Sequence, residues 1–162
     1  MAFSIHKGYV PGCIGKLVEL HARYYHRLVG FDLPFECKVA QELSEFCRRY
    51  DEQADGLWLA MHDGEIEGSI AVDGSGVAQD GAHLRWFIAS DKGRGTGTGT
   101  ALLGAALDFC RAKKYPRVYL WTFDGLEAAR HLYEKAGFRL AHQQRGTQWG
   151  IAVDEQRFEL EL

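Results

Sequence analysis

The sequence lacks the patterns that mark a membrane span, a metal site or a disulfide framework. No apolar run reaches the roughly 18 residues that a membrane span needs, and we expect no contact with a membrane. The first residues hold no apolar block of signal-peptide length, which predicts a cytoplasmic protein. The four cysteines form no Cys-x-x-Cys pair, so they indicate neither a zinc site nor a redox motif. We therefore expect reduced, mostly buried thiols and no metal.

An excess of basic charge is missing as well. The chain has 19 Lys and Arg against 22 Asp and Glu, a formal net charge of -3 and a pI of about 6.2. A nucleic-acid-binding domain normally carries a basic face, so this balance argues against nucleic acid as a partner. Repeats, linkers and low-complexity segments are absent too. With 162 residues, 46% of them hydrophobic, we expect a single domain over 1–162.

Hydrophobic periodicity and turn residues predict elements in the order β-α-α-β-β-β-α-β-α-β-β. The expected strands are 2–9, 57–61, 66–72, 83–89, 118–121, 138–141 and 149–160, with a hairpin turn at 144–147. The expected helices are 14–29, a second that Pro34 opens, 100–114 and 126–136. Three consecutive strands before a helix do not suit a regular doubly wound sheet. We predict a mixed, mostly antiparallel sheet with helices on both faces.

Glycines alternate with other residues in KGRGTGTGTALL, residues 92–103, between a predicted strand and a predicted helix. No lysine follows as a Walker loop requires, and the spacing of the glycines does not match G-x-G-x-x-G. A flexible linker fits the composition but not the flanking strand and amphipathic helix. Glycine-rich backbone at a helix N-terminus binds anions, so we interpret the stretch as a metal-free pyrophosphate site.

Two motifs give this interpretation a family. RGTGTG, residues 94–99, matches R/Q-x-x-G-x-G/A, and ARHLYEKAGF, residues 129–138, resembles A-x-x-L-Y-E-K-x-G-F. In this order, with a strand between them, they resemble the GNAT acetyltransferase superfamily over essentially the whole chain. The resemblance implies an α/β (α+β) domain of the GNAT acyl-CoA N-acyltransferase fold. Residues 8–32 and Leu84-Arg85 further resemble the GNAT part of regulators fused to a MarR-type DNA-binding domain; here we expect a stand-alone enzyme.

The resemblance assigns residues to acetyl-CoA. In the family, the strand before the loop splays from its neighbour and its backbone binds the pantetheine arm and polarises the thioester carbonyl. The residues so implied in cofactor binding are Phe87, Ile88, Ala89, Arg94, Gly95, Thr96, Gly97, Thr98, Gly99, Thr100 and Leu126. A purely structural interpretation of residues 87–89 is a buried strand, which is compatible with main-chain contacts to a ligand.

Tyr133 matches the family tyrosine that donates a proton to the leaving thiolate, although it could equally pack its ring on the sheet. The general base stays open: Trp121 stands where some members have a glutamate, and Leu126 where many have an asparagine. Three residues are candidates for the acceptor pocket: His21, Tyr25 and Arg85. The first two could instead pack on the sheet, and Arg85 could pair with a core acid such as Glu67.

The resulting hypothesis is an N-acetyltransferase that uses acetyl-CoA and acts on the primary amine of a small molecule. A protein lysine or N-terminal acetyltransferase and a non-catalytic acyl-CoA sensor are the alternatives. A homodimer is implied by the resemblance alone.

Overall fold

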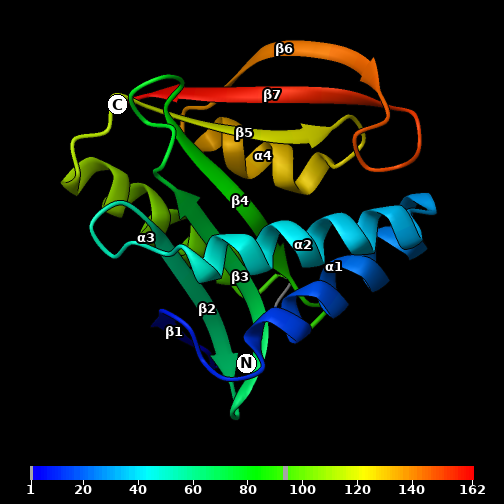
Figure 1. The fold of residues 1–162 in the computed structure, drawn as a ribbon, viewed down its shortest axis with the longest axis horizontal. Coiled ribbons are helices and arrows are strands. Elements are labelled where there is room, and N and C mark those ends of the chain that lie inside the picture. The colour runs from blue at the N-terminus through cyan, green and yellow to red at the C-terminus, as the bar shows by residue number, and fades with distance from the viewer. Residues whose placement is uncertain (1, 93–94) are drawn as a thin grey trace.

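A single mixed sheet organises the described part of the chain, residues 2–92 and 95–162 of a computed structural model (Figure 1). Its strands follow the order β1-β2-β3-β4-β5-β7-β6. The strands are β1 (Ser4–Lys7), β2 (Gly56–His62), β3 (Glu65–Asp73), β4 (Ala82–Ala89), β5 (Arg117–Phe123), β6 (Arg139–Gly146) and β7 (Val153–Glu161). Only β4 and β5 pair in parallel, and the other neighbours are antiparallel. The predicted order of elements and the mostly antiparallel sheet are confirmed.

The helices cover both faces of this sheet, as predicted. They are α1 (Cys13–Val29), α2 (Leu33–Arg48), α3 (Thr98–Ala112) and α4 (Glu127–Lys135). Apolar residues of α1 and α2, among them Leu17 and Leu43, pack on one face of β2 and β3. Those of α3 and α4, among them Leu102 and Tyr133, pack on the other face. Each helix therefore buries one apolar stripe against the sheet, as its periodicity predicts.

A bulge in β4 interrupts the ladder with β3. Ser69 pairs with Ile88 but Ala71 pairs with Arg85, so β4 carries one more residue than β3 over this stretch. Trp86 lies in the bulge with a positive φ of 48°, and its carbonyl accepts a hydrogen bond of 2.7 Å from the Ser69 hydroxyl. Such bulges bend a strand and re-aim its side chains. The ladder between β4 and β5 ends at His83, and beyond it the strands diverge (Figure 1).

The last hairpin differs from the prediction. A turn was expected at 144–147, but β6 continues through Gly146 and pairs there with Val153, and the connection is 147–152. The reason is that β6 is an exposed edge strand, so its polar residues keep the backbone ladder without showing an apolar alternation. Helix α3 likewise begins at Thr98 rather than at the predicted residue 100.

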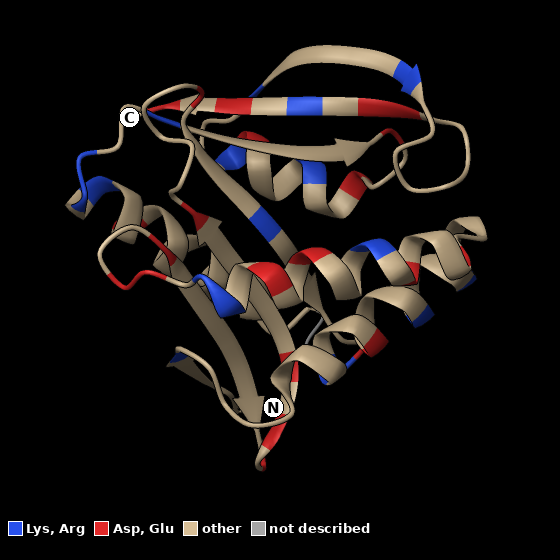
Figure 2. Ribbon diagram, in the orientation of Figure 1, with Lys and Arg blue, Asp and Glu red and all other residues tan. Residues whose placement is uncertain are grey.

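Acidic and basic side chains are mixed along β7 and over α1 and α2 (Figure 2). Many of them pair locally. Arg157 on β7 donates two hydrogen bonds to Asp80, at 2.8 and 2.7 Å, and its guanidinium lies 3.9 Å from the ring centroid of Tyr119. These contacts fasten the loop before β4 to the β5–β7 half, at the end where β4 and β5 still pair.

Candidate active site

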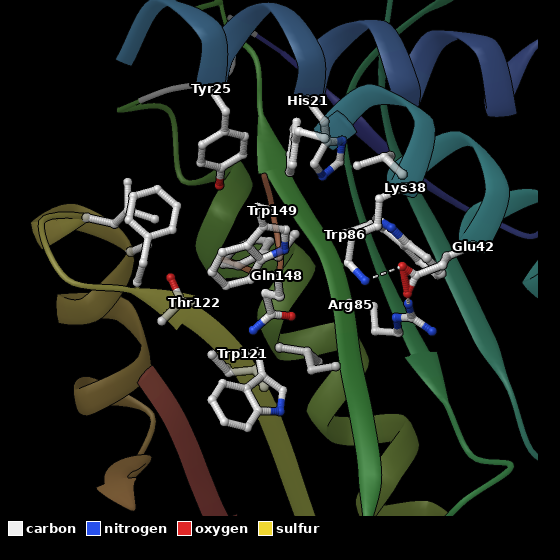
Figure 3. Close-up of a pocket in the computed structure, with 18 of the residues that line it drawn as sticks. His21, Tyr25, Lys38, Glu42, Arg85, Trp86, Trp121, Thr122, Gln148 and Trp149 are labelled. Carbon is white, nitrogen blue, oxygen red and sulfur yellow. Dashed lines mark hydrogen bonds and ion pairs between the residues drawn. The ribbon is translucent and has the colours of Figure 1, made fainter. Parts of the chain in front are cut away.

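A cavity of about 180 Å³ opens where β4 and β5 diverge (Figure 3). Helices α1 and α2 form one wall, β4 and β5 the floor, and α4 and the 147–152 loop the remaining sides. The lining residues are His21, Tyr25, Phe31, Phe35, Lys38, Val39, Glu42, His83, Leu84, Arg85, Trp86, Phe87, Leu120, Trp121, Thr122, Phe123, Leu126, Ala129, Tyr133, Gln148 and Trp149. The lining is therefore rich in aromatic side chains, and its charged side chains are Lys38, Glu42 and Arg85.

The N-terminus of α3 exposes glycine backbone of the kind that binds anions. Gly97 caps the helix with φ of 85°, and Gly95 before it has φ of 73°. A Cβ at either position would meet no described atom within 4 Å, so this backbone faces open space. The Thr96 and Thr98 hydroxyls lie 2.7 Å apart. These features fit a pyrophosphate held by backbone N–H groups and the helix dipole.

Several predicted cofactor residues surround this terminus. Gly99 lies in the first turn of α3 and faces α4 and β4: a Cβ there would approach Leu132 to 3.2 Å and Phe87 to 3.6 Å. Thr100 is exposed in the first turn of the helix, and Arg94 lies outside the described residues. Leu126 caps α4 and lines the cavity. The predicted loop and the second motif thus meet in space.

Residues 87–89 lie on β4 beyond the end of its ladder with β5. Ile88 is buried, while Phe87 lines the cavity. The Phe87 and Tyr133 ring centroids are 6.0 Å apart, which joins the diverging strand to α4. A gap between two diverging strands offers main-chain groups that an extended arm could bind as an added strand.

Tyr133 stands in the cavity wall on α4 and is almost fully buried. Its ring packs on Phe138 and Phe158, so Tyr133 does pack its ring on the sheet, as the alternative interpretation predicts. Desolvation by burial, with a smaller effect from the facing Tyr25, raises the pKa of its phenol above the ordinary value. The hydroxyl is therefore a proton donor at neutral pH.

His21 and Tyr25 lie one turn apart on α1, and both line the cavity (Figure 3). Each residue therefore packs against its neighbours and also forms part of the pocket wall. Tyr25 packs its ring among Phe31, Phe35 and Phe123, at centroid distances of 6.0, 5.4 and 5.9 Å. The His21 Nδ1 lies 2.7 Å from the Leu17 carbonyl. Burial lowers the pKa of His21 to about 4, against a smaller opposing effect of that hydrogen bond.

Arg85 lies at the charged end of the cavity. Its partners do not include Glu67, the acid suggested from the sequence. It donates to Glu42 Oε1 at 2.7 Å and lies 3.5 Å from Asp73, whereas Glu67 accepts a hydrogen bond from Ser90. The alternative that Arg85 pairs with an acid is therefore correct, but Glu67 is not that acid, because the register places Arg85 opposite Ala71 and Glu67 beside Ser90. Lys38 completes the group at 2.8 Å from Glu42 Oε2.

Sequence reasoning missed Lys38, Glu42, Gln148 and Trp149. Lys38 and Glu42 have i,i+4 spacing, which is also typical of a solvated helix face. Gln148 and Trp149 lie in the connection before β7, where no motif marks them. Glu155 holds this loop: it accepts hydrogen bonds from the Gln148 main chain at 3.0 Å and side chain at 2.9 Å.

Among the described residues, no three His, Cys, Asp or Glu side chains gather in a way that could hold a metal ion. In the same ranges no helix has the length and apolarity to cross a membrane.

Solved structures share the diverging sheet and its helices. An acetyltransferase from Streptococcus agalactiae superposes with a TM-score of 0.76 at 21% identity, covering 99% of this chain and 98% of that one. A GNAT family acetyltransferase from Elizabethkingia anophelis with acetyl-CoA bound superposes with a TM-score of 0.69 at 19% identity, covering 99% and 98%. At such identities the likeness shows the fold.

The family is shown by sequence. The Acetyltransferase (GNAT) family pattern matches residues 16–138, and the chain belongs to this family. N-acetylaspartate synthetase of Xenopus tropicalis is 28% identical over 140 residues, 86% of this chain and 51% of the relative. The Homo sapiens protein of that name is 26% identical over 140 residues, 86% of this chain and 46% of the relative. The chain thus spans about half the length of the curated relatives it matches. Membership confirms the predicted family and its acyl donor, acetyl-CoA.

Proposed function

We propose that this chain transfers an acetyl group from acetyl-CoA to the primary amine of a small molecule. The observation that carries the proposal is the cavity of about 180 Å³ beside the divergence of β4 and β5, with Tyr133 in its wall. It is smaller than the roughly 300–1,000 Å³ of pockets for drug-sized ligands. A compact acceptor fits this space better than a protein segment does.

The chain's own groups have defined tasks in the transfer. The backbone of residues 95–99 at the start of α3 holds the pyrophosphate, together with Arg94, and the main chain of 87–89 positions the acyl arm. A β4 backbone N–H polarises the thioester carbonyl. The neutral amine forms a bond to the carbonyl carbon and gives up one proton to a base, the carbon–sulfur bond breaks, and the Tyr133 hydroxyl protonates the departing thiolate.

The walls of the cavity suggest which amines to test. Lys38 and Arg85 place two cations beside Glu42 at one end, which suits an acceptor that also bears a carboxylate. The relatives named N-acetylaspartate synthetase make L-aspartate the first candidate. The aromatic residues around Tyr25 suit a ring, so L-phenylalanine and phenethylamine complete a panel with and without a carboxylate.

A thermal-shift titration with acetyl-CoA tests the donor site. A ligand that binds only the folded state raises Tm by mass action, so acetyl-CoA should raise the Tm of this protein. Arg94→Glu should abolish most of that shift, while Arg139→Glu, an exposed arginine of β6, should keep it. Saturating acetyl-CoA that leaves the wild-type Tm unmoved would refute the donor site.

Release of the CoA thiol, measured with the amine panel and with lysine and N-terminal peptides, separates the alternatives. Turnover with amines supports the small-molecule enzyme. Turnover with peptides alone favours a protein acetyltransferase, and a Tm shift without any turnover favours a sensor.

We also propose that residues 1–162 fold as one domain and that two copies associate, for which light scattering after size exclusion is the test. Residues 8–32, which resemble the MarR-fused GNAT domains in sequence, bring His21 and Tyr25 to the pocket. In this proposal that segment supplies the acceptor wall.

A further inference from the structure

His21 is a buried titratable side chain to which the proposed chemistry gives no task beyond lining the pocket. Its Nδ1 lies 2.7 Å from the carbonyl oxygen of Leu17, one turn earlier on α1. A carbonyl oxygen can only accept, so Nδ1 carries the ring proton and donates it to Leu17. Nε2 is then the unprotonated nitrogen, and its lone pair is available as a hydrogen-bond acceptor.

Nε2 of His21 is in contact with the cavity, which follows from its burial and its hydrogen-bond partners. Only 5% of the His21 surface is exposed, yet no fully buried side-chain nitrogen or oxygen of the described residues lacks a partner. Since the one described hydrogen bond of His21 is made by Nδ1, Nε2 lies at the cavity surface instead of inside the packed core. Figure 3 shows His21 and Tyr25 reaching from α1 toward the cavity.

The surroundings keep the imidazole neutral. Tyr25 faces it from its own helix, and the pocket adds Lys38 and Glu42 from α2, Arg85 from β4 and Tyr133 from α4. Both Glu42 oxygens are engaged by cations, Oε1 by Arg85 at 2.7 Å and Oε2 by Lys38 at 2.8 Å. Burial lowers the His21 pKa to about 4, so the ring is neutral at pH 7, and Nε2 can accept a hydrogen bond but has no proton to donate.

We propose that Nε2 of His21 is the acceptor for the proton that the attacking amine loses. The inference rests on the proposed function and supplies the base that it leaves open. The amine lone pair forms the carbon–nitrogen bond, the carbon–sulfur bond breaks, and one proton passes from the nitrogen to His21 Nε2. Tyr133 gives its proton to the sulfur. Imidazolium and tyrosinate then exchange one proton through solvent, so the products are the amide and the CoA thiol.

Two other groups of the pocket are less suited to this task. Glu42 has both oxygens in ion pairs, as described above. His83 is also neutral, since burial lowers its pKa to about 3, but its ring stacks on Tyr119 at a centroid distance of 4.5 Å. That pair sits where β4 and β5 still hold together, away from Phe87 and Tyr133, which contact each other beyond the divergence.

A pair of substitutions tests the assignment kinetically. His21→Asn keeps an N–H for the Leu17 carbonyl but has no atom that takes a proton at the place of Nε2. We expect kcat with the best amine of the panel to fall by about 10²-fold or more, with the Tm shift from acetyl-CoA kept. His21→Ala should regain rate with added imidazole. His26→Asn is the control, because its Nδ1 similarly contacts a carbonyl, of Phe31 at 2.9 Å, but outside the cavity.

Nitrogen NMR of the free wild-type protein provides a readout that needs neither turnover nor a stable variant. The His21 ring should show a protonated Nδ1, an unprotonated Nε2 and a titration near pH 4, and L-aspartate, L-phenylalanine or phenethylamine should shift the Nε2 signal without acetyl-CoA. A protonated Nε2, or a folded His21→Asn protein whose kcat stays within about threefold of wild type, would overturn the assignment alone. A wild type without turnover on any amine would overturn the proposed function, and the assignment with it.

Discussion

Arg85 Nη2 lies 2.7 Å from Glu42 Oε1, so an ion pair ties the bulged strand β4 to helix α2 at the polar end of the cavity. The guanidinium also lies 4.2 Å from the ring centroid of Trp86, the residue of the bulge. Both contacts fix the arginine in the pocket before any acceptor arrives. Its remaining N–H groups are therefore pre-oriented for a carboxylate.

Arg85→Met should separate the two tasks of this residue. Removing the cation breaks its hydrogen bond to Glu42, while Glu42 keeps Lys38 at 2.8 Å and Asp73 keeps Arg49 at 2.6 Å, so the unfolding free energy should fall by only about 1 kcal/mol. KM for L-aspartate should rise at least tenfold, whereas KM for phenethylamine should change little. Steady-state kinetics at a temperature where the variant is folded measure this. Equal changes for both amines would show that Arg85 does not select a carboxylate.

Tyr133→Phe should lower kcat by about 10²–10³-fold and leave acetyl-CoA binding intact, because only the donated proton is lost. Calorimetric titration with CoA and thiol-release kinetics give the two quantities. Tyr115→Phe is the matched control: its hydroxyl donates to the Ala54 carbonyl at 2.8 Å, away from the cavity. This variant should lose about 1 kcal/mol of stability and keep its kcat. A Tyr133→Phe enzyme with normal turnover would contradict the donor role.

Glu155→Ala should loosen the 147–152 loop. The buried carboxylate accepts three hydrogen bonds, two from Gln148 and one from Gln144 at 3.2 Å. Burial opposes ionisation, but these hydrogen bonds prevail and hold the Glu155 pKa below its ordinary range. Because Gln148 and Trp149 line the cavity, acceptor KM should rise several-fold while the Tm shift from acetyl-CoA persists. An unchanged KM would mean that the loop has no part in acceptor binding.

Acid should destabilise the protein through His21. Its pKa falls from 6.5 to about 4 on folding, so the unfolded chain binds the proton more readily. The stability is fully present above pH 6.5 and decreases as the pH falls toward 4. From His21 alone we expect a loss of about 2 kcal/mol between pH 7 and pH 5. His83, with its pKa lowered to about 3, acts in the same direction.

Urea unfolding at several pH values measures this slope, and His21→Asn should remove the contribution of His21. A variant with the same slope as wild type would show that His21 is not buried as a neutral ring.

Gly97→Ala tests the cap of α3. At φ of 85° a side chain costs about 1–2 kcal/mol, and the strained backbone should present its N–H groups poorly to a pyrophosphate. We expect lower stability and a Kd for CoA raised about tenfold. Gly104→Ala, in the interior of the same helix with open space around it, should instead add up to about 1 kcal/mol and leave Kd unchanged. Similar Kd values for the two variants would argue against the cap as the anion site.

Local pattern alone determined much of this protein. The periodicity of 14–29 and 100–114 and the turn residues between the strands predicted the order of elements, since each element must bury its own apolar side. The motifs at 94–99 and 129–138 predicted the family and the place of Tyr133. The sequence also indicates His21, Tyr25 and Arg85 as residues of the acceptor pocket, and all three line one cavity.

The tertiary structure determined the contacts between residues that are distant in sequence. The register of β3 and β4 places Arg85 opposite Ala71, from where it pairs with Glu42 and not with Glu67, and no pattern in β4 predicts the bulge at Trp86. Glu155 places Gln148 and Trp149 over the cavity through hydrogen bonds across the last hairpin. The proton of His21 sits on Nδ1 because a helix carbonyl faces it, and burial keeps the ring neutral. Register, burial and hydrogen-bond partners depend on the packed chain, which is why the sequence could name these residues without assigning their tasks.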